Sequence, residues 1–438
     1  MRFAPHTDDD AREMLAACGL SSIDELFAHL PPGVTLDREL GIPEGLSEME
    51  LVSEMRRLAA RNRHADDLVC FAGGGAYDHY VPSVVWALAG RSELYTSYTP
   101  YQPEISQGVL QILFEYQSMI CELTGLEVSN ASLYDGPTAL VEAVHMATSA
   151  TGRSRILVAE ALDSRYLQTL QTYGAGEHFG VETIANDRGV TRVEGIVGEP
   201  AAVVVQHPNG WGNLEPARDL FGAAHAAGAR AIEVFDPLSL GVVASPAELG
   251  ADIAVGEGQV LGNHLNYGGP YLGVIAARMQ DVRRMPGRIV GETADVDGAR
   301  GYVLTLQARE QHIRREKATS NICTNQTLMA VAATVYLAWL GPEGLRELGQ
   351  QCLAKTRYAA ERLSGLSDTG LKYPEAEFFK EFVVRTERDP VAIQSALLEA
   401  GFLTGPIVGN DGLLVSVTER RTREEIDAFT KAFEEAIQ

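Results

Sequence analysis

The middle of the chain alternates short apolar runs, rich in β-branched residues, with segments whose apolar residues recur at helical spacing. The apolar runs predict strands over 155–159, 201–206, 229–235, 251–256 and 271–276. The helical spacing predicts helices over 137–150, 163–174 and 216–227. Apolar strands that alternate with helices are typical of a largely parallel sheet buried on both faces. We therefore expect an α/β fold that binds ligands beyond the carboxyl ends of its strands.

The regions on either side of this core have patterns of their own. Thr7 with the acidic residues after it predicts the start of one N-terminal helix, and Ser22 with Glu25 predicts another. Towards the C-terminus, strand patterns over 378–386 and 413–418 are each followed by a helical pattern. This second alternation predicts a smaller α/β unit.

At 438 residues the chain is too long for one hydrophobic core, since cores stop growing at roughly 250–300 residues. We expect an N-terminal helical segment (1–65), a large domain (66–325) and a small C-terminal domain (326–438). The longest apolar run, Leu328 to Leu340, is shorter than the about 20 residues of a transmembrane helix. It predicts a buried core helix, and we expect no membrane contact.

Charge and cysteine content narrow the class of protein. The 36 Lys+Arg against 59 Asp+Glu give a net charge of -23, which argues against nucleic-acid binding. The five cysteines are scattered without CxxC spacing, so they predict reduced thiols and no metal site. The N-terminal residues lack the apolar stretch of a secretory signal. We therefore expect a cytoplasmic protein.

Lysine is rare and confined to the last part of the chain. The lysines are Lys317, Lys355, Lys372, Lys380 and Lys431. Compositional bias is the simpler cause of this rarity. Whatever its cause, lysine chemistry is absent before residue 317.

Two polar residues follow neighbouring predicted strands and suggest a reaction centre. Asp236 ends one strand, Gln259 ends the next, and a Gly-Gly turn follows within 266–270. On local sequence alone, Asp236 before Pro237 is more often a turn residue than a functional acid. The layout as a whole is nevertheless that of pyridoxal phosphate enzymes of fold type I. There the Asp pairs with the pyridine nitrogen and a lysine in the second position forms the Schiff base. An amide such as Gln259 cannot form an imine.

Two further segments have both a structural and a functional interpretation. The predicted helix start at Gly136–Thr138 has free backbone amides that could bind a phosphate. Ordinary helix capping explains the same residues equally well. The segment 309–324 is the densest basic stretch of an acidic chain. It is either a solvated helix face or a contact for an anion or an acidic partner.

Several segments together resemble a known family. They are YTPYQPEISQG (98–108), TGLEVSNASLYDGPTA (124–139), VVVQHPN (203–209), GGPYLG (268–273), MPGRIVGET (285–293) and LQAREQHIRREKATSNICT (306–324). They resemble the P-protein family of the glycine cleavage system, and within it the alpha half of the form split into two subunits. The resemblance extends over nearly the whole chain.

The resemblance implies the transferase-like fold of type I pyridoxal phosphate enzymes and an oxidoreductase activity. Members of this family decarboxylate glycine and pass its aminomethyl group to the lipoyl arm of the H-protein. In the split form, alpha and beta subunits assemble as an α2β2 heterotetramer, and beta carries the Schiff-base lysine. The resemblance therefore implies that pyridoxal phosphate is bound mainly by beta, in agreement with Gln259 here.

The resemblance also singles out candidate residues, although it assigns none of them a catalytic role. The expected active-site lining comes from the loop that closes over glycine and cofactor: Tyr95, Tyr98, Thr99, Pro100, Tyr101 and Gln102. Residues expected near the cofactor phosphate or at an interface are Gly268, Gly269, Arg309, His312, Arg314 and Arg315. The basic group among them would hold the loop or receive the H-protein.

Two other functions compete with this one. The chain is alternatively a non-catalytic scaffold that stabilises beta and docks the H-protein. A less favoured alternative is a self-sufficient pyridoxal phosphate decarboxylase or aminotransferase that uses another lysine.

Overall fold

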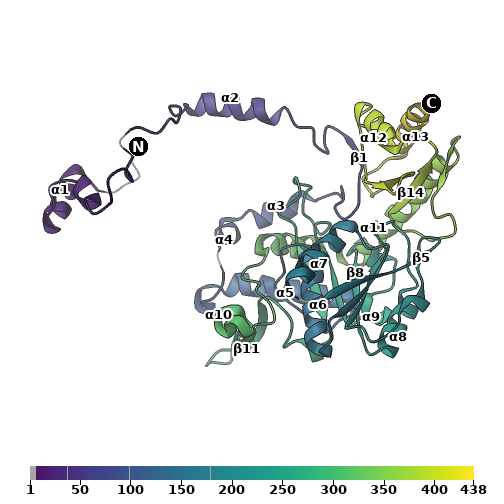
Figure 1. The fold of residues 1–438 in the computed structure, drawn as a ribbon, viewed down its shortest axis with the longest axis horizontal. Coiled ribbons are helices and arrows are strands. Elements are labelled where there is room, and N and C mark those ends of the chain that lie inside the picture. The colour runs from purple at the N-terminus through teal and green to yellow at the C-terminus, as the bar shows by residue number, and fades with distance from the viewer. Residues whose placement is uncertain (1–5, 37, 98, 178) are drawn as a thin grey trace. The chain divides into compact units, whose positions relative to one another are not determined.

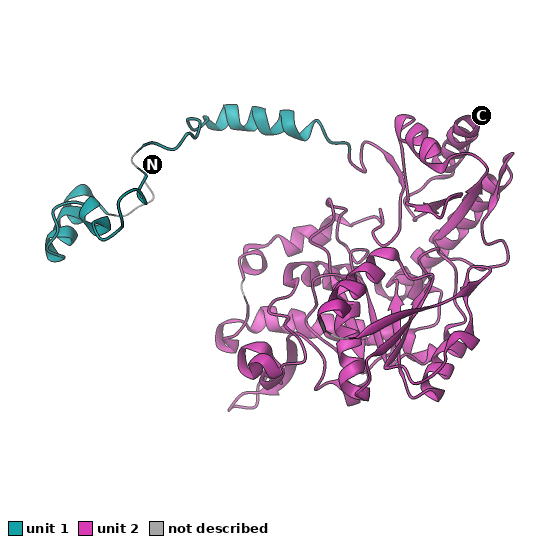
Figure 2. Ribbon diagram, viewed as in Figure 1, with its two compact units in different colours: residues 1–63 teal, residues 64–438 magenta. Residues whose placement is uncertain are grey.

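The computed structural model describes residues 6–36, 38–97, 99–177 and 179–438. The chain divides into two compact units, residues 1–63 and residues 64–438 (Figure 2). The expected large and small domains therefore belong to one compact unit.

The N-terminal unit is built from short helices with strong caps. It contains α1 (Asp8–Ala17), the 3-10 turn η1 (Asp24–Phe27) and α2 (Glu48–Ala59). Thr7 forms the expected capping box with Asp10, and Ser47 forms a second one with Glu50. None of the described residues of this unit is buried. Its helices thus depend on local hydrogen bonds, because helices this short are marginal without packing.

A seven-stranded sheet forms the centre of the second unit, in the order β2-β10-β9-β8-β7-β3-β4 (Figure 1). The strands are β2 (Val128–Ser129), β3 (Arg155–Ala159), β4 (Gly180–Ile184), β7 (Ala202–His207), β8 (Arg230–Phe235), β9 (Ile253–Glu257) and β10 (Gly273–Ala277). All five predicted strands are confirmed. Strands β9, β8, β7, β3 and β4 are parallel, whereas β10 is antiparallel to β9 and β2. The connection from β9 to β10 contains no helix, so it cannot make the crossover that a parallel neighbour needs.

Helices cover both faces of this sheet because its side chains alternate between them. Val204 packs with α6 (Gly136–Thr151) and α7 (Ser164–Glu177) on one face. Val203 and Val205 pack with α8 (Ala217–Ala226) on the other. The three helices agree with the sequence prediction to within a few residues.

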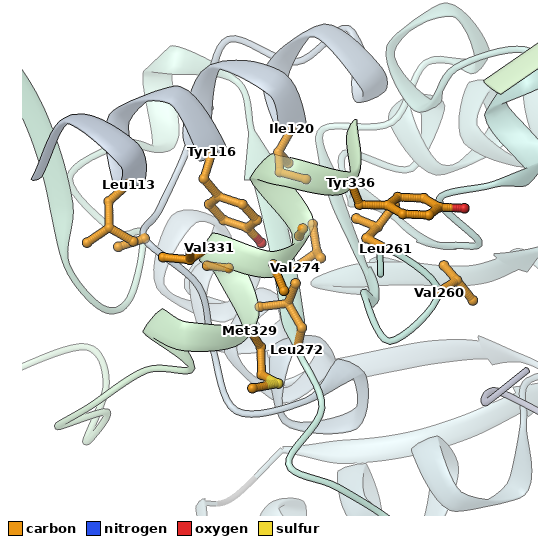
Figure 3. Packing of buried hydrophobic residues seen from close by; sticks show 14 of the residues in the cluster. Leu113, Tyr116, Ile120, Val260, Leu261, Leu272, Val274, Met329, Val331 and Tyr336 are labelled. Atoms are coloured by element: carbon orange, nitrogen blue, oxygen red, sulfur yellow. The ribbon is translucent and has the colours of Figure 1, made fainter. Parts of the chain in front are cut away.

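The largest hydrophobic cluster lies on one face of β9 and β10, from which it receives Ala254, Val274 and Ala276. Figure 3 shows part of this cluster. The cluster also receives Leu113, Tyr116 and Ile120 from α5 (Gln107–Thr124). Val260 and Leu261, which follow Gln259 directly, point into the same cluster. The polypeptide just after β9 is therefore held by apolar packing, which fixes the position of Gln259.

Helix α11 (Thr327–Ser364) completes this cluster and continues into the C-terminal part. Met329 to Thr334 and Tyr336 are buried, which confirms the predicted core helix. Among the described residues it is the one helix long and apolar enough to cross a membrane. Its backbone is interrupted at Gly341, with φ 63° before Pro342, and its first half packs against α3 (Ser83–Ala89) and α5. We therefore interpret α11 as a core helix.

The C-terminal part is an antiparallel sheet covered by two helices. Its strands are β13 (Thr369–Leu371), β14 (Glu381–Thr386), β17 (Gly412–Ser416) and β16 (Ile407–Val408). Its helices are α12 (Pro390–Glu399) and α13 (Arg423–Ile437), the latter with the expected Thr422–Glu425 capping box.

A short parallel pair joins the two ends of the second unit. Strand β1 (Val69–Phe71) pairs with β15 (Phe402–Thr404), although β1 precedes the large sheet in sequence. Phe71 is fully buried and stacks on Phe429, with ring centroids 4.1 Å apart. Residues 69–71 thus lie in the C-terminal part, outside the sequence range expected for it.

Several shorter elements carry no clear sequence pattern. The strands are β11 (Ile289–Ala294), β12 (Arg300–Thr305), β5 (Asn186–Asp187) and β6 (Val190–Thr191). The short helices are α4 (Ser92–Tyr95), α9 (Pro246–Leu249) and α10 (Gln311–Arg314). The 3-10 turns are η2 (Pro103–Ile105), η3 (Val193–Gly195), η4 (Ser239–Gly241), η5 (Met279–Asp281), η6 (Gln307–Arg309) and η7 (Arg315–Lys317).

Replacing Phe71 by Ala should destabilise the chain by about 3–5 kcal/mol, because it leaves a cavity against Phe429. The free energy of unfolding is measured by chemical denaturation. Val391→Ala, an exposed position on α12, is the matched control and should change stability by less than about 0.5 kcal/mol. Equal effects of the two substitutions would contradict the burial of β1.

Candidate functional site

A surface hollow brings together two segments that the sequence singled out. Its volume is about 500 Å³. The lining residues are Tyr101, Glu310, Gln311, His312, Arg315, Glu316, Ile322 and Cys323. Three candidates, Tyr101, His312 and Arg315, thus share one site, while Tyr98 lies outside the described residues.

Arg288 holds the two sides of this hollow together. It is only 4% exposed, and its Nη2 donates to the Cys323 carbonyl at 2.7 Å and to the Tyr101 hydroxyl at 3.2 Å. Its Nη1 donates to Asn325 Oδ1 at 3.0 Å. The guanidinium carbon also lies 5.5 Å from the centroid of the half-exposed Tyr101 ring. Arg288 therefore sets the position of Tyr101, a role that the sequence did not reveal.

The basic candidates differ in what they offer to a ligand. Arg309 donates to the carbonyls of Met285 and Gly287, and burial lowers the pKa of its guanidinium. It is thus committed to holding the 285–287 loop. Arg314 and Arg315 are exposed, and His312 lies edge-on to Tyr101 with centroids 6.2 Å apart.

The other loop candidates are distributed around the hollow and beyond it. Tyr95 is exposed at the end of α4, Pro100 is buried, and Thr99 and Gln102 lie next to Tyr101 in the chain. None of these four lines the hollow.

The candidate glycines lie in a turn that closes on itself. Gly268 and Gly269 have φ of 96° and 137°, which only glycine adopts readily. The Gly269 amide donates to the Asn266 carbonyl at 2.8 Å, and the Asn266 side chain donates back to Gly269. The Gly269 amide is therefore already used within its own turn.

A second, buried group of side chains lies at the carboxyl ends of β8 and β9. The Asp236 carboxylate forms an ion pair with Lys380, Nζ to Oδ2 2.7 Å, and the Lys380 side chain is 2% exposed. The same Nζ lies 3.5 Å from the centroid of the Tyr77 ring and 3.2 Å from His79 Nε2. Asp236 is thus an ion-pair partner, and the sequence analysis missed Lys380. The available signal was an adjacent lysine and glutamate inside the otherwise apolar run FFKEFVV.

Gln259 uses its whole amide within the chain. Its Nε2 donates to the carbonyls of Tyr77 at 3.1 Å and Asn263 at 2.7 Å. Its Oε1 accepts from the Tyr77 amide at 2.9 Å. A buried amide with these partners is a structural clamp on residue 77.

Carboxylates of the chain itself occupy the start of α6. Asp135 Oδ1 accepts from the Thr138 amide at 2.8 Å, and Glu257 Oε2 accepts from the Gly136 amide at 3.0 Å. Glu257 Oε1 accepts from the Gln259 and Leu272 amides, both at 3.0 Å. Burial raises the pKa of Glu257 to about 7, against these hydrogen bonds. Of the two interpretations of Gly136–Thr138, capping is therefore the one realised.

His79, Cys352 and Glu419 place three potential metal-ligand atoms within 4.8 Å of one another. His79 Nδ1 lies 2.6 Å from Glu419 Oε2. Burial alone would raise the pKa of Glu419, but His79 brings it down to about 2. The Lys380 ammonium beside His79 places a positive charge where a metal cation would have to approach. We therefore interpret the group as an ion-pair network.

Glu381 completes the buried network. Its Oε1 accepts from the Gly74 amide at 2.6 Å, and its Oε2 accepts from the Tyr77 hydroxyl at 3.0 Å. Burial raises the pKa of Glu381 to about 7. A raised folded-state pKa favours the native state below the unfolded value of 4.5, and the advantage is lost as pH rises through about 7.

Glu381→Gln should therefore remove a pH-dependent loss of stability. A glutamine can accept from Gly74 and donate to Tyr77, so the contacts persist without the titration. Between pH 5 and pH 8 the wild type should lose more unfolding free energy than the variant, by up to about 3 kcal/mol. Denaturation curves at both pH values measure this difference. Identical pH slopes would show that Glu381 does not titrate in this range.

Comparison with known proteins identifies the family of this chain. The family model for the glycine cleavage system P-protein matches residues 1–433. The chain is 50% identical to the "Probable glycine dehydrogenase (decarboxylating) subunit 1" of Moorella thermoacetica, over 99% of both chains. It is 51% identical to the protein of the same description from Carboxydothermus hydrogenoformans, over 98% of both.

Solved structures agree. A crystal structure of glycine decarboxylase (P-protein) in inhibitor-bound form matches with TM-score 0.94 and 46% identity over 100% of both chains. Lactobacillus brevis glutamate decarboxylase matches with TM-score 0.68 at 12% identity, over 95% of this chain and 96% of that one, which shows the fold alone. These neighbours confirm the expected fold of type I pyridoxal phosphate enzymes. The chain belongs to the glycine cleavage system P-protein family, and its relatives are subunit 1 of glycine dehydrogenase.

Proposed function

We propose that this chain is the alpha subunit of a two-subunit glycine dehydrogenase and completes the active site of a beta subunit. Gln259 carries this proposal, because it stands where the reaction needs a lysine and its amide is fully hydrogen-bonded. The description "subunit 1" of the relatives supports a partner. We further propose an α2β2 assembly in the cytoplasm.

The cofactor of the proposed reaction belongs to the beta subunit. Bound there, pyridoxal phosphate would supply the electron sink that glycine decarboxylation needs. The corresponding groups of this chain do not fit it, since Asp236 is paired with Lys380 and Gln259 replaces the lysine. The aminomethyl group would then pass to the lipoyl arm of the H-protein.

The contribution of this chain is the hollow at Tyr101. A polar phenol held by Arg288 at a half-exposed position is suited to close over a small ligand bound by another chain. Tyr95, Tyr98, Thr99, Pro100 and Gln102 remain proposed members of the active-site lining of the whole complex, and Gly268 and Gly269 remain proposed interface residues.

The exposed basic residues suit a different task. Arg315 lines the hollow, and both it and the preceding Arg314 are exposed in a chain of net charge -23. A local positive patch in an acidic protein favours the approach of an acidic partner. We propose that this patch receives the H-protein. If the chain only stabilises beta, Tyr101→Phe will leave the rate of glycine decarboxylation unchanged.

Tyr101→Phe in the reconstituted α2β2 complex should lower kcat for glycine decarboxylation roughly tenfold, because one positioned hydroxyl is lost. Assembly is checked by size-exclusion chromatography. Tyr80→Phe, at another exposed tyrosine, is the control and should retain full activity. Full activity of an assembled Tyr101→Phe complex would favour the scaffold function.

Arg314→Ala combined with Arg315→Ala should raise the KM for H-protein roughly tenfold and leave kcat at saturation unchanged. The dependence of KM on salt should weaken, since two screened charges are lost. Steady-state kinetics at two ionic strengths measure both effects. The exposed Arg357→Ala is the control, and an equal KM effect there would argue against a local docking patch.

A further inference from the structure

We propose that the cofactor pocket of this chain is closed from within by side chains that take up the contacts of the missing cofactor. Lys380 takes the place of the protonated ring nitrogen, and Glu257 takes the place of the phosphate. The proposal rests on the proposed function for the identity of the replaced group, and its test does not require glycine decarboxylation.

The first replacement is at Asp236. In this fold the corresponding carboxylate pairs with the cationic pyridine nitrogen. Without that cation a buried carboxylate would be left unpaired, which is costly in a low dielectric. Here the Lys380 ammonium, 2.7 Å from Asp236 Oδ2 and buried, supplies the positive charge from within the chain.

The second replacement is at the start of α6. Backbone amides at a helix N-terminus bind phosphate well, because they are free donors in a positive field. The Gly136 amide donates instead to Glu257 Oε2 at 3.0 Å, and Asp135 caps Thr138. Glu257 also accepts the amides that lead into and out of the β9–β10 connection. A carboxylate of the chain thus uses the donor that an anionic ligand would need.

Tyr77 and Gln259 link these two ends. Gln259 binds the backbone of Tyr77 on both its N–H and its carbonyl, and the Tyr77 ring lies against Lys380. The backbone amide of Gln259 donates to Glu257 at 3.0 Å. Asp236 and Glu257 are therefore connected by contacts of the chain itself.

Lys380 is also poorly placed to act as a Schiff-base lysine. The aldehyde of pyridoxal phosphate is para to its ring nitrogen. A lysine paired with Asp236 occupies the nitrogen end, on the far side of the ring from the aldehyde. The geometry therefore disfavours a self-sufficient enzyme based on Lys380.

The test uses variants of the full-length chain, purified with its partner, in which the side chains that close the pocket are replaced. Gln259→Lys restores the nucleophile alone, and Gln259→Lys with Lys380→Met and Glu257→Ala also removes the two internal charges. Each complex is incubated with pyridoxal phosphate and reduced with borohydride. Peptide mass spectrometry then locates pyridoxyl-lysine, so that labelling at position 259 is distinguished from labelling of the partner.

We expect at least a tenfold greater yield at position 259 in the triple variant than in Gln259→Lys. The matched control combines Gln259→Lys and Glu257→Ala with Lys372→Met in place of Lys380→Met. Lys372 is a partly buried lysine paired with Asp411, and its removal should give no such gain. Equal labelling of Gln259→Lys and the triple variant would overturn the proposal. So would a triple variant that is folded by circular dichroism and remains unlabelled.

A second measurement does not require the triple variant to fold. Lys380→Met should lower Tm because Asp236 is left unpaired, and adding Asp236→Asn should recover at least half of the loss. No recovery would show that Lys380 does not serve to neutralise Asp236. Glycine decarboxylation by the wild-type complex is assayed separately, so its failure would count against the proposed function alone.

Discussion

The buried ion pair between Asp236 and Lys380 is the contact on which the second unit depends. It links the carboxyl end of β8 in the parallel sheet to the residue just before β14, an antiparallel strand of the C-terminal part. Both charges are withdrawn from water, so neither is stable there without the other. Tyr77, His79 and Glu381 take their positions around this pair.

Much of the fold was predictable because its signals are local. Strands buried on both faces produce continuous apolar runs, and Val203 to Val205, from one such run, pack against helices on both faces of the sheet. Strand β1 was not predictable, since its three residues become a strand only by pairing with β15, far away in sequence. The antiparallel direction of β10 depends on the missing crossover, which periodicity does not encode.

The candidate site was predictable only in part, for the same reason. The sequence indicated Gln259 and Asp236 because each follows an apolar strand, and it indicated Tyr101 and His312 through family resemblance. It revealed neither Arg288 nor Lys380, because the partners of each lie far away along the chain. It placed Arg309 near the cofactor phosphate or at an interface, and it did not indicate that the Nη atoms of Arg309 donate to the carbonyls of Met285 and Gly287.

The break in α11 has a mechanical consequence. Leu345, Leu348 and Cys352, which follow the break at Gly341, still pack in the large sheet's cluster. Ala359, Ala360 and Leu363 pack in the C-terminal cluster, so the second half of the helix spans both. Pro342 has no N–H, so the helix bends there without breaking a backbone hydrogen bond. Rotation of one part against the other is opposed by the apolar contacts of the second half of the helix and by the Asp236–Lys380 pair. Resistance to domain opening in this chain comes from packing and from ion pairing together.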